Sequence, residues 1–351
     1  ACVLAPRDAI QQSIERFYGN RETSAISDAI EQASNTEVRV RGAETSAAGD
    51  DVRDDDAPVI KFVQVMIAEA VDILNAEDAT IPAAVAAAKP QIIRAIELVV
   101  AAFEAGGRLI YVGAGTSGRL GVLDASECPP TFLSDPRMVQ GVIAGGWDAL
   151  RMAIEGAEDH ESDGAAAIDE KEVGPHDVVF GITTGGTTPY VHGALRRARE
   201  RGAKTVFFAC VKAEHVASEA DVEIRVLVGP EVITGSTRLK AGTATKLVLN
   251  MVTTIAMVRI GKVYENLMVD VNTRANRKLV DRGTRMIMTV TGLERAAAAD
   301  LLTRSGGHVK TALVMHARGV DRAAAERLLA TTRGHLAPLL APPAGRPGSH
   351  P

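Results

Sequence analysis

The chain has 351 residues, a length typical of more than one domain. Its net charge of −5, with no basic tract that interleaves aromatic residues, argues against a general nucleic-acid or membrane-surface binder. The cysteines, Cys2, Cys128 and Cys210, show neither a disulfide framework nor a metal-ligand spacing, which suits a reducing cytoplasm. There is also no apolar run of membrane-spanning length and no signal-peptide pattern, so we expect a cytoplasmic protein.

The N-terminal part of the chain carries the weakest pattern. Residues 1–57 include an acidic, small-residue stretch at 44–56, which is typical of a solvated loop. We expect an N-terminal arm that is partly disordered or loosely packed. Residues 58–74 then have apolar side chains at every third and fourth position, which predicts a helix. Another helical run spans 81–105, and Pro90 inside it predicts a break into two helices.

The stretch 108–132 is the centre of the chain. Arg108 to Val112 is a short apolar run that predicts a buried strand. Residues 113–118, which we call the first turn, carry three glycines and two hydroxyl side chains, and a helical pattern follows. A strand, a glycine turn and a helix N-terminus together favour an anion site, because backbone N–H groups and the helix dipole attract negative charge. The candidate binding residues are Gly115, Thr116 and Ser117.

The glycine spacing also fits the G-x-G-x-x-G pattern of dinucleotide sites. Such a site needs a second strand that ends in an acidic residue about 20 positions further on. That region here holds Pro129, Pro130 and Pro136, which break a strand rather than end one. We therefore prefer the phosphate of a small molecule to a dinucleotide.

Strand and helix patterns alternate beyond Phe132. We expect strands at 139–144, 177–182, 204–210 and 222–228. We expect helices at about 147–168 and about 245–260, and a third helix that follows residues 183–190 and ends at about Arg201. This alternation predicts the α/β class, with a doubly wound parallel sheet flanked by helices. In such sheets, ligands bind outside the carboxyl ends of the strands.

Two further loops follow predicted strands and favour anions. The second turn, residues 183–190, carries glycines and threonines, and the third loop, residues 229–243, places hydroxyls, an arginine and a lysine at a helix start. An ordinary capped helix start with surface charges remains the alternative for the third loop. The candidate binding residues are Thr184, Thr187 and Thr188 in the second turn and Ser236, Thr237, Arg238 and Lys240 in the third loop.

The C-terminal region is short-helical and punctuated by glycines. Residues 291–334 predict a small three-helix domain, separate from a main domain at 58–290. Residues 335–351 are expected to form a disordered tail, because the end of the chain is rich in proline and glycine.

Three runs resemble signatures of the N-acetylmuramic acid 6-phosphate etherases: residues 113–132, 229–246 and 261–271. The first contains Asp124-Ala-Ser-Glu-Cys-Pro-Pro-Thr-Phe132, which is long and unusual. The resemblance extends over about residues 74–329. It implies the sugar-isomerase (SIS) fold with a small C-terminal helical domain, a fold similar to that of the glucokinase regulatory protein.

The resemblance also implies a reaction and a set of partners. The family cleaves the D-lactyl ether of N-acetylmuramate 6-phosphate, giving N-acetylglucosamine 6-phosphate and D-lactate, by elimination followed by hydration. It uses no metal or nucleotide cofactor, and it forms homodimers. Two glutamates of the family match Glu127, as the proton donor, and Glu158, as the base.

The sequence itself bears on both glutamates. Leu150, Ile154 and Glu158 are spaced four apart, so a helix would aim Glu158 inward and burial would raise its pKa. A partly exposed glutamate is the alternative. We expect the helix of Glu127 to stop before Cys128. A straight helix would still separate Ser117 from Glu127 by ~15 Å. Either the helix is shorter or bent, or Glu127 serves a site whose phosphate is held by other loops or by another subunit.

Two departures leave the substrate and the reaction class open. Thr187 stands where the family usually has an arginine, and the N-terminal family motif is not recognisable. A sugar-phosphate-binding regulator and a SIS-fold isomerase are therefore alternatives, although both glutamates favour the etherase. His192 and His308 are interpreted as surface and packing residues, respectively. No helix-turn-helix pattern supports a transcription factor.

Overall fold

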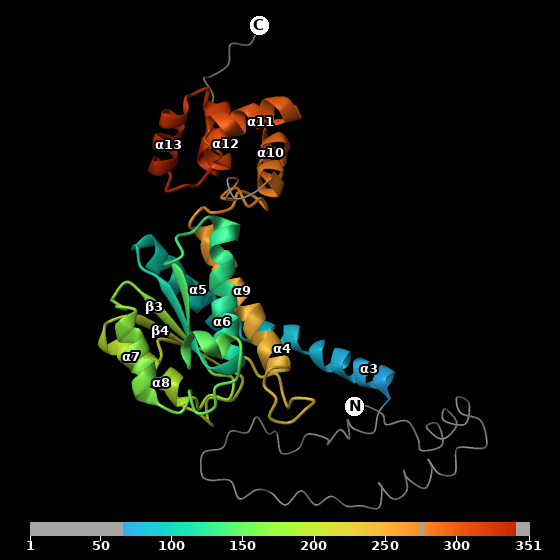
Figure 1. The fold of residues 1–351 in the computed structure, drawn as a ribbon, viewed down its shortest axis with the longest axis vertical. Helices are drawn as coiled ribbons and strands as arrows, with labels where there is room; N and C mark the ends of the chain where they lie inside the picture. The colour runs from blue at the N-terminus through green and yellow to red at the C-terminus, as the bar shows by residue number, and fades with distance from the viewer. Residues whose placement is uncertain (1–65, 272, 274–276, 342–351) are drawn as a thin grey trace, which may run out of the picture. The chain divides into compact units, whose positions relative to one another are not determined.

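The computed structural model describes residues 66–271, 273 and 277–341 (Figure 1). The predicted arm at 1–57 and the last part of the predicted tail, 342–351, lie outside the described residues. From residue 66 on, three helices precede the sheet: α3 (Ile67–Asp78), α4 (Ile81–Ala87) and α5 (Lys89–Glu104). The break between α4 and α5 falls at Ala88, beside Pro90, as predicted.

A parallel sheet of five strands forms the centre. The strands are β1 (Leu109–Gly113), β2 (Val139–Ile143), β3 (Val178–Ile182), β4 (Lys204–Ala209) and β5 (Val222–Arg225). Their order is β2-β1-β3-β4-β5, so the strand order reverses between β1 and β3. This arrangement confirms the predicted doubly wound sheet, and it identifies the carboxyl ends of β1 and β3 as the switch point where ligands bind in such folds.

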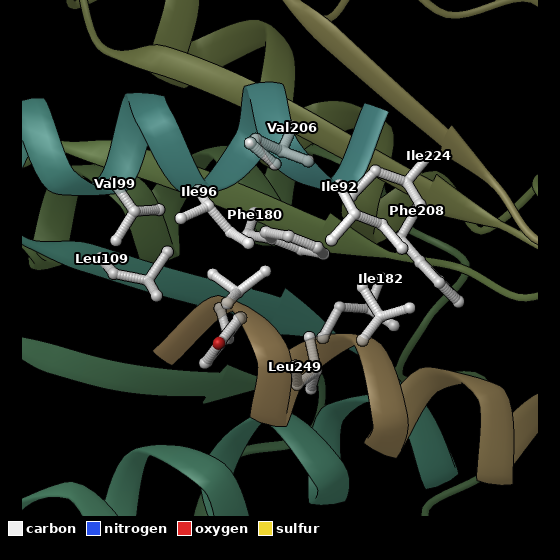
Figure 2. Packing of buried hydrophobic residues seen from close by; sticks show 14 of the residues in the cluster. Ile92, Ile96, Val99, Leu109, Phe180, Ile182, Val206, Phe208, Ile224 and Leu249 are labelled. Carbon is white, nitrogen blue, oxygen red and sulfur yellow. The ribbon is translucent and has the colours of Figure 1, made fainter. Parts of the chain in front are cut away.

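Each face of the sheet has its own hydrophobic core, because alternate strand residues point to opposite faces. Leu109 and Tyr111 of β1 face a core formed with α4, α5 and α9, whereas Ile110 and Val112 face a core formed with α8. Figure 2 shows how Ile92 and other α5 side chains meet the sheet on the first face. Both faces are therefore covered, which explains why the strands are apolar along their whole length.

The helix after the first turn is longer than predicted. It is α6 (Gly115–Phe132), and Pro129 and Pro130 lie inside it, whereas we expected it to stop at Glu127. Both prolines fall near its C-terminal end, where few main-chain hydrogen bonds remain to be lost. Burial of Phe132 in the core favours the extra turn. The short-helix alternative for Glu127 is therefore excluded.

The predicted helix at 147–168 is wrong. The structure has a short 3₁₀ helix, η2 (Gly146–Leu150), then turns, and only then α7 (Glu161–Glu170). Gly156 adopts a φ of +75° in this region, a conformation that a right-handed helix does not contain. The residues 151–160 between η2 and α7, which include Glu158, form a connecting segment that we call the Glu158 loop.

The two remaining helices of this part are α8 (Pro189–Glu200) and α9 (Lys240–Arg259). In Figure 1, α5, α6 and α9 lie side by side on one face of the sheet, and α7 and α8 lie together on the other. By length and composition α9 could cross a membrane, but 56% of its apolar window is buried inside the protein. We therefore interpret it as the central helix of a core.

The C-terminal helices share a separate hydrophobic core. They are α10 (Arg277–Thr291), α11 (Arg295–Arg304), α12 (Val309–Arg318), α13 (Arg322–Thr331) and α14 (Ala337–Leu340). The core takes in Ile287 of α10 as well as residues of the three helices expected from residue 291. Residues 335–341 were expected in a disordered tail, but Leu336 and Leu339 are buried there, so this segment is ordered by packing.

Candidate functional site

The structure brings the three predicted anion loops to one edge of the sheet. Gly113 at the end of β1 pairs with Ile182 at the end of β3, so the first and second turns leave the sheet side by side. The third loop follows β5 and returns to the first turn, because a Cβ on Gly242 would lie 3.5 Å from the side chain of Thr116. Segments far apart in the sequence therefore meet at the switch point.

The first turn has an open helix N-terminus. Its N-cap residue, Ala114, has an extended conformation and makes no side-chain capping hydrogen bond. Gly115 has a φ of +50°, and no heavy atom lies within 4 Å of the position of a Cβ there. Ser117 is buried and Thr116 half-buried. The backbone N–H groups at the start of α6 are thus presented to a polar, accessible corner.

Side chains within the second turn hold one another in place. The Thr183 hydroxyl donates to the Thr188 hydroxyl at 2.9 Å, and the imidazole Nε2 of His192 lies 2.7 Å from the carbonyl oxygen of Gly186. His192 is half-buried, and its ring lies 5.6 Å from that of Phe207. The sequence interpretation of His192 as a surface residue is therefore wrong, because this side chain braces the turn. Thr184 is buried in the same turn.

The third loop contains an internal cap that the sequence analysis missed. The buried carboxylate of Glu231 accepts hydrogen bonds from the N–H groups of Lys240 and Ala241, each at 2.9 Å. Lys240 is also buried, and its ammonium lies 2.6 Å from the carboxylate of Glu77 in α3. These contacts favour the capped-helix alternative for Lys240. Ser236 and Thr237 remain half-buried and Arg238 remains exposed.

The two predicted catalytic glutamates are both exposed, in different settings. Glu127 lies on the solvent side of α6, ten residues beyond Ser117 in an unbroken helix, which is ~15 Å along the axis. Glu158 lies in the Glu158 loop rather than on an inward helix face, so its expected burial is wrong. Its carbonyl oxygen accepts a hydrogen bond from the N–H of Tyr190 at 3.0 Å, which ties it to the end of the second turn.

A second tether holds the Glu158 loop from the other side. Arg119, in the first part of α6, donates to the carbonyl oxygen of Met152 at 3.0 Å. The first part of the loop is therefore attached to α6 through Met152, and the last part is attached to the start of α8 through Glu158. This arrangement brings Glu158 close to the second turn although the intervening sequence has no helix to position it.

A buried carboxylate joins α6 to its neighbours. Asp124 accepts hydrogen bonds from the Tyr111 hydroxyl at 3.0 Å, from the Asn250 amide at 2.7 Å and from the Thr253 hydroxyl at 3.3 Å. Burial raises the pKa of Asp124, and these donors oppose the shift. Because Glu127 follows three residues later on the same helix, this network sets how α6, and with it Glu127, lies against α9.

The cysteines and acidic residues offer no metal or nucleophile site in the described part of the chain. Cys128 and Cys210 are free and buried, and burial raises the pKa of the Cys128 thiol to about 12. No group of three or more His, Cys, Asp or Glu residues is arranged to hold a metal within 66–341, where the structure describes the chain.

Comparison with known proteins identifies the fold of the main domain. Residues 91–199 match the model of the glucokinase regulatory protein N-terminal SIS domain, and residues 156–255 match the SIS domain. The sheet and its helices therefore form a SIS domain. Among solved structures, a phosphoheptose isomerase from Neisseria gonorrhoeae is 19% identical, with a TM-score of 0.40 over 54% of this chain and 99% of its own.

Curated relatives are far closer in sequence. An N-acetylmuramic acid 6-phosphate etherase from Nostoc punctiforme is 58% identical over 250 residues, which cover 71% of this chain and 81% of that protein. An N-acetylmuramic acid 6-phosphate etherase from Gloeobacter violaceus is 59% identical over 243 residues, which cover 69% of this chain and 79% of that protein.

Proposed function

Because this chain belongs to the N-acetylmuramic acid 6-phosphate etherase family, we propose that it is a carbon–oxygen lyase acting on N-acetylmuramate 6-phosphate. It cleaves the D-lactyl ether and releases D-lactate and N-acetylglucosamine 6-phosphate, in the cytoplasm, as a step of cell-wall amino-sugar recycling. The observation that carries the proposal is the high identity to these relatives over most of their length. The arrangement of the three loops and two glutamates supports it.

The first turn is the best-supported phosphate site. Of the three helices that start at this edge, α9 is capped by Glu231, and α8 starts with Pro189 and donates its next N–H to the carbonyl of Glu158. Only α6 begins without such a partner among the three. The start of α6, with Thr116 and Ser117, therefore has the donors and the dipole to bind a phosphate.

The second turn contributes hydroxyl groups rather than a fixed charge. Thr184, Thr187 and Thr188 lie next to the first turn across the sheet edge. The arginine that the family usually has at position 187 would bind an anion with two N–H groups, whereas a threonine offers one hydroxyl. We propose that phosphate binding in this chain depends more on the backbone of α6 than on a side-chain cation.

Glu127 and Glu158 act as the acid and the base of the reaction. Elimination of the ether removes the proton beside the sugar aldehyde and protonates the leaving lactate oxygen, so two proton-transfer groups are needed. Glu158 is tethered at the second turn, where it is close to a sugar whose phosphate lies on α6. It therefore serves as the base, and Glu127 serves as the proton donor.

The position of Glu127 supports a homodimer with the site near the subunit interface. A separation of ~15 Å along α6 is more than one sugar phosphate spans from the first turn. Large apolar side chains are exposed on both helices of the α6–α9 pair: Leu123 on α6, and Met251 and Ile255 on α9. Apolar patches of this kind mark interaction surfaces. We propose that one subunit supplies Glu127 to a site whose phosphate-binding turns belong to the other.

A lactate assay tests the reaction and its residues together. We expect purified protein to release D-lactate from N-acetylmuramate 6-phosphate. Glu127→Gln and Glu158→Gln should each lower kcat by about 100-fold or more, because each removes a proton-transfer group while keeping the side-chain shape. Glu155→Gln, an exposed glutamate in the same loop as Glu158, is the matched control and should retain activity.

The outcomes separate the alternatives. A folded protein that binds sugar phosphates but releases no lactate would be a regulator, and one that interconverts aldose and ketose phosphates would be an isomerase. If both variants still release lactate at the parent rate, the proposed reaction is supported, but Glu127 and Glu158 are not its acid and base.

A further inference from the structure

Lys246 lies on the face of α9 that turns toward α6. Thr243, Lys246 and Asn250 are spaced three and four residues apart, so they share one face of the helix. Asn250 on this face donates to Asp124 of α6 at 2.7 Å. The Lys246 side chain is exposed, and its charge acts to lower the pKa of Asp124. Lys246 therefore lies on the face of α9 that borders the seam between α6 and α9.

Lys246 has a charge that the described part of the protein does not neutralise. No carboxylate among those residues forms an ion pair with it, whereas Lys240, two turns earlier on α9, is buried against Glu77 at 2.6 Å. An exposed lysine on a helix is ordinary in itself. Its position beside the proposed site makes an anionic group of the substrate a candidate partner for its charge.

The level of Lys246 follows from how the two helices run. Thr116 meets α9 at Gly242, and Asp124 meets it at Asn250, so α6 and α9 run in the same direction in register. Lys246 is four residues beyond Gly242, which is ~6 Å along the axis from the level of the first turn. It therefore lies beyond the proposed phosphate site, and nearer to it along the helix pair than the Glu127 of the same subunit.

The substrate of the proposed reaction has a second anion, which the sugar ring separates from its phosphate. The phosphate is on O6 of the sugar, and the lactyl group on O3 carries a carboxylate on the far side of the ring. A carboxylate that enters a site beside two glutamates needs a cation, because like charges repel and a partly desolvated anion requires pairing.

Other cations at this edge are less suitable. Arg119 is engaged with the carbonyl of Met152 at 3.0 Å. Arg238 precedes the start of α9, which puts it at the level of the first turn and the phosphate. Lys246 alone among these three lies further along the seam, with a flexible stem that can follow the ligand.

We propose that Lys246 binds the lactyl carboxylate and selects amino-sugar phosphates that carry a 3-O-lactyl group over those with a free 3-hydroxyl. The inference rests on the proposed function, since it names the group that distinguishes the substrate from its sugar product. It assigns Lys246 a role in specificity rather than in proton transfer.

The test compares a ligand that has the lactyl group with one that lacks it. In Lys246→Met, KM for N-acetylmuramate 6-phosphate should rise about 10- to 100-fold, the loss expected for one charge-assisted contact, with a much smaller change in kcat. The inhibition constant of N-acetylglucosamine 6-phosphate should stay within about twofold, because it makes no such contact. Lys246→Arg should restore part of the loss. Lys89→Met, an exposed helical lysine of α5, is the control.

Two results would overturn the proposal. If Lys246→Met binds both sugar phosphates more weakly by the same factor, Lys246 contacts the phosphate or has a structural role. If the constants for both ligands are unchanged, Lys246 does not contact the lactyl carboxylate. If the parent protein releases no lactate, the proposed reaction fails, but dissociation constants of the same two ligands, measured by calorimetry, still decide on Lys246. Should Lys246→Met fail to fold, Lys246→Gln replaces it in both measurements.

Discussion

Individual glycines in the first turn have different physical tasks. Gly115 has a left-handed backbone, so it permits the turn itself. Gly113 and Gly118 have no such requirement but lie where strand and helix almost touch: a Cβ on Gly118 would be 2.7 Å from the carbonyl oxygen of Gly113 and 2.6 Å from Ile143. The glycine spacing that suggests a dinucleotide site is thus partly a packing requirement between β1 and α6.

We predict that Gly118→Ala destabilises the protein by about 1–3 kcal/mol, because the added methyl group must push α6 away from β1. The measurement is urea unfolding. Gly174→Ala is the matched control, since no heavy atom lies within 4 Å of a Cβ at that position. Equal stability of Gly118→Ala and the parent would show that α6 adjusts freely, which would contradict close packing as the reason for this glycine.

At the scale of elements, one carboxylate joins the starts of β1 and β3. Asp177 accepts hydrogen bonds from the backbone N–H of Arg108 at 2.8 Å, from the Arg108 guanidinium at 2.6 Å and from the Gly174 N–H at 2.9 Å. Burial acts to raise the pKa of Asp177, but the bonds from Arg108 and Gly174 outweigh it, so the pKa lies below its ordinary value. These bonds align the two strands whose far ends carry the first and second turns.

Asp177→Asn should therefore cost about 2–3 kcal/mol at neutral pH, since it leaves buried donors and a guanidinium without their anion. A lowered folded-state pKa means that the ionised carboxylate stabilises the fold above its ordinary pKa of about 4, and that this contribution is lost as the pH falls further. The stability difference between parent and variant should shrink between about pH 5 and pH 3. Chemical unfolding at several pH values measures this.

Asp169→Asn is the control for this pH dependence. Asp169 also pairs with arginines, Arg197 and Arg201, but on the exposed surface of α7 and α8. Its removal should have a much smaller effect, because solvent and salt screen exposed pairs. A stability difference for Asp177→Asn that stays constant down to pH 3 would mean that its contribution is not ionic.

At the scale of the whole molecule, the unbroken α6 carries Glu127 away from the first turn of its own chain, where we propose that the phosphate binds. Leu123, one turn before Glu127 on α6, is exposed in the single chain, and so is Glu127 itself. Both features are consistent with a site shared between two copies of the chain.

Complementation tests the shared site. Gly115→Asp puts a negative charge at the proposed phosphate site, and aspartate tolerates the left-handed backbone there. Glu127→Gln removes the proton donor. Each homodimer should be inactive, whereas a heterodimer of the two variants would contain one intact site and recover about half of the parent rate. Isolation with two different tags and a lactate assay give the measurement. An inactive heterodimer would place the whole site within one subunit.

Local patterns in the sequence were enough for the sheet. Five apolar runs became five parallel strands, and Pro90 divided two helices where it was expected to. These signals are reliable because the apolar pattern of a buried strand and the effect of proline on a helix both depend on residues that are close together in the chain. The resemblance in three runs was likewise sufficient for the family, because those runs are long and unusual.

Local patterns failed where distant contacts outweighed them. Core burial of Phe132 carried α6 past two prolines, and a left-handed glycine with two backbone tethers turned the predicted helix around Glu158 into a loop. No spacing rule finds Glu231, because it caps a helix that begins nine residues later through a folded loop.

The sequence by itself therefore determined the fold class and the family, which depend on short-range geometry and on residue identity. Only the tertiary structure decided which helix N-terminus is open, that Lys240 is already paired, and how far Glu127 lies from the first turn. The physical reason is that hydrogen-bond satisfaction and separation in space depend on partners far away in the chain, which no local pattern contains.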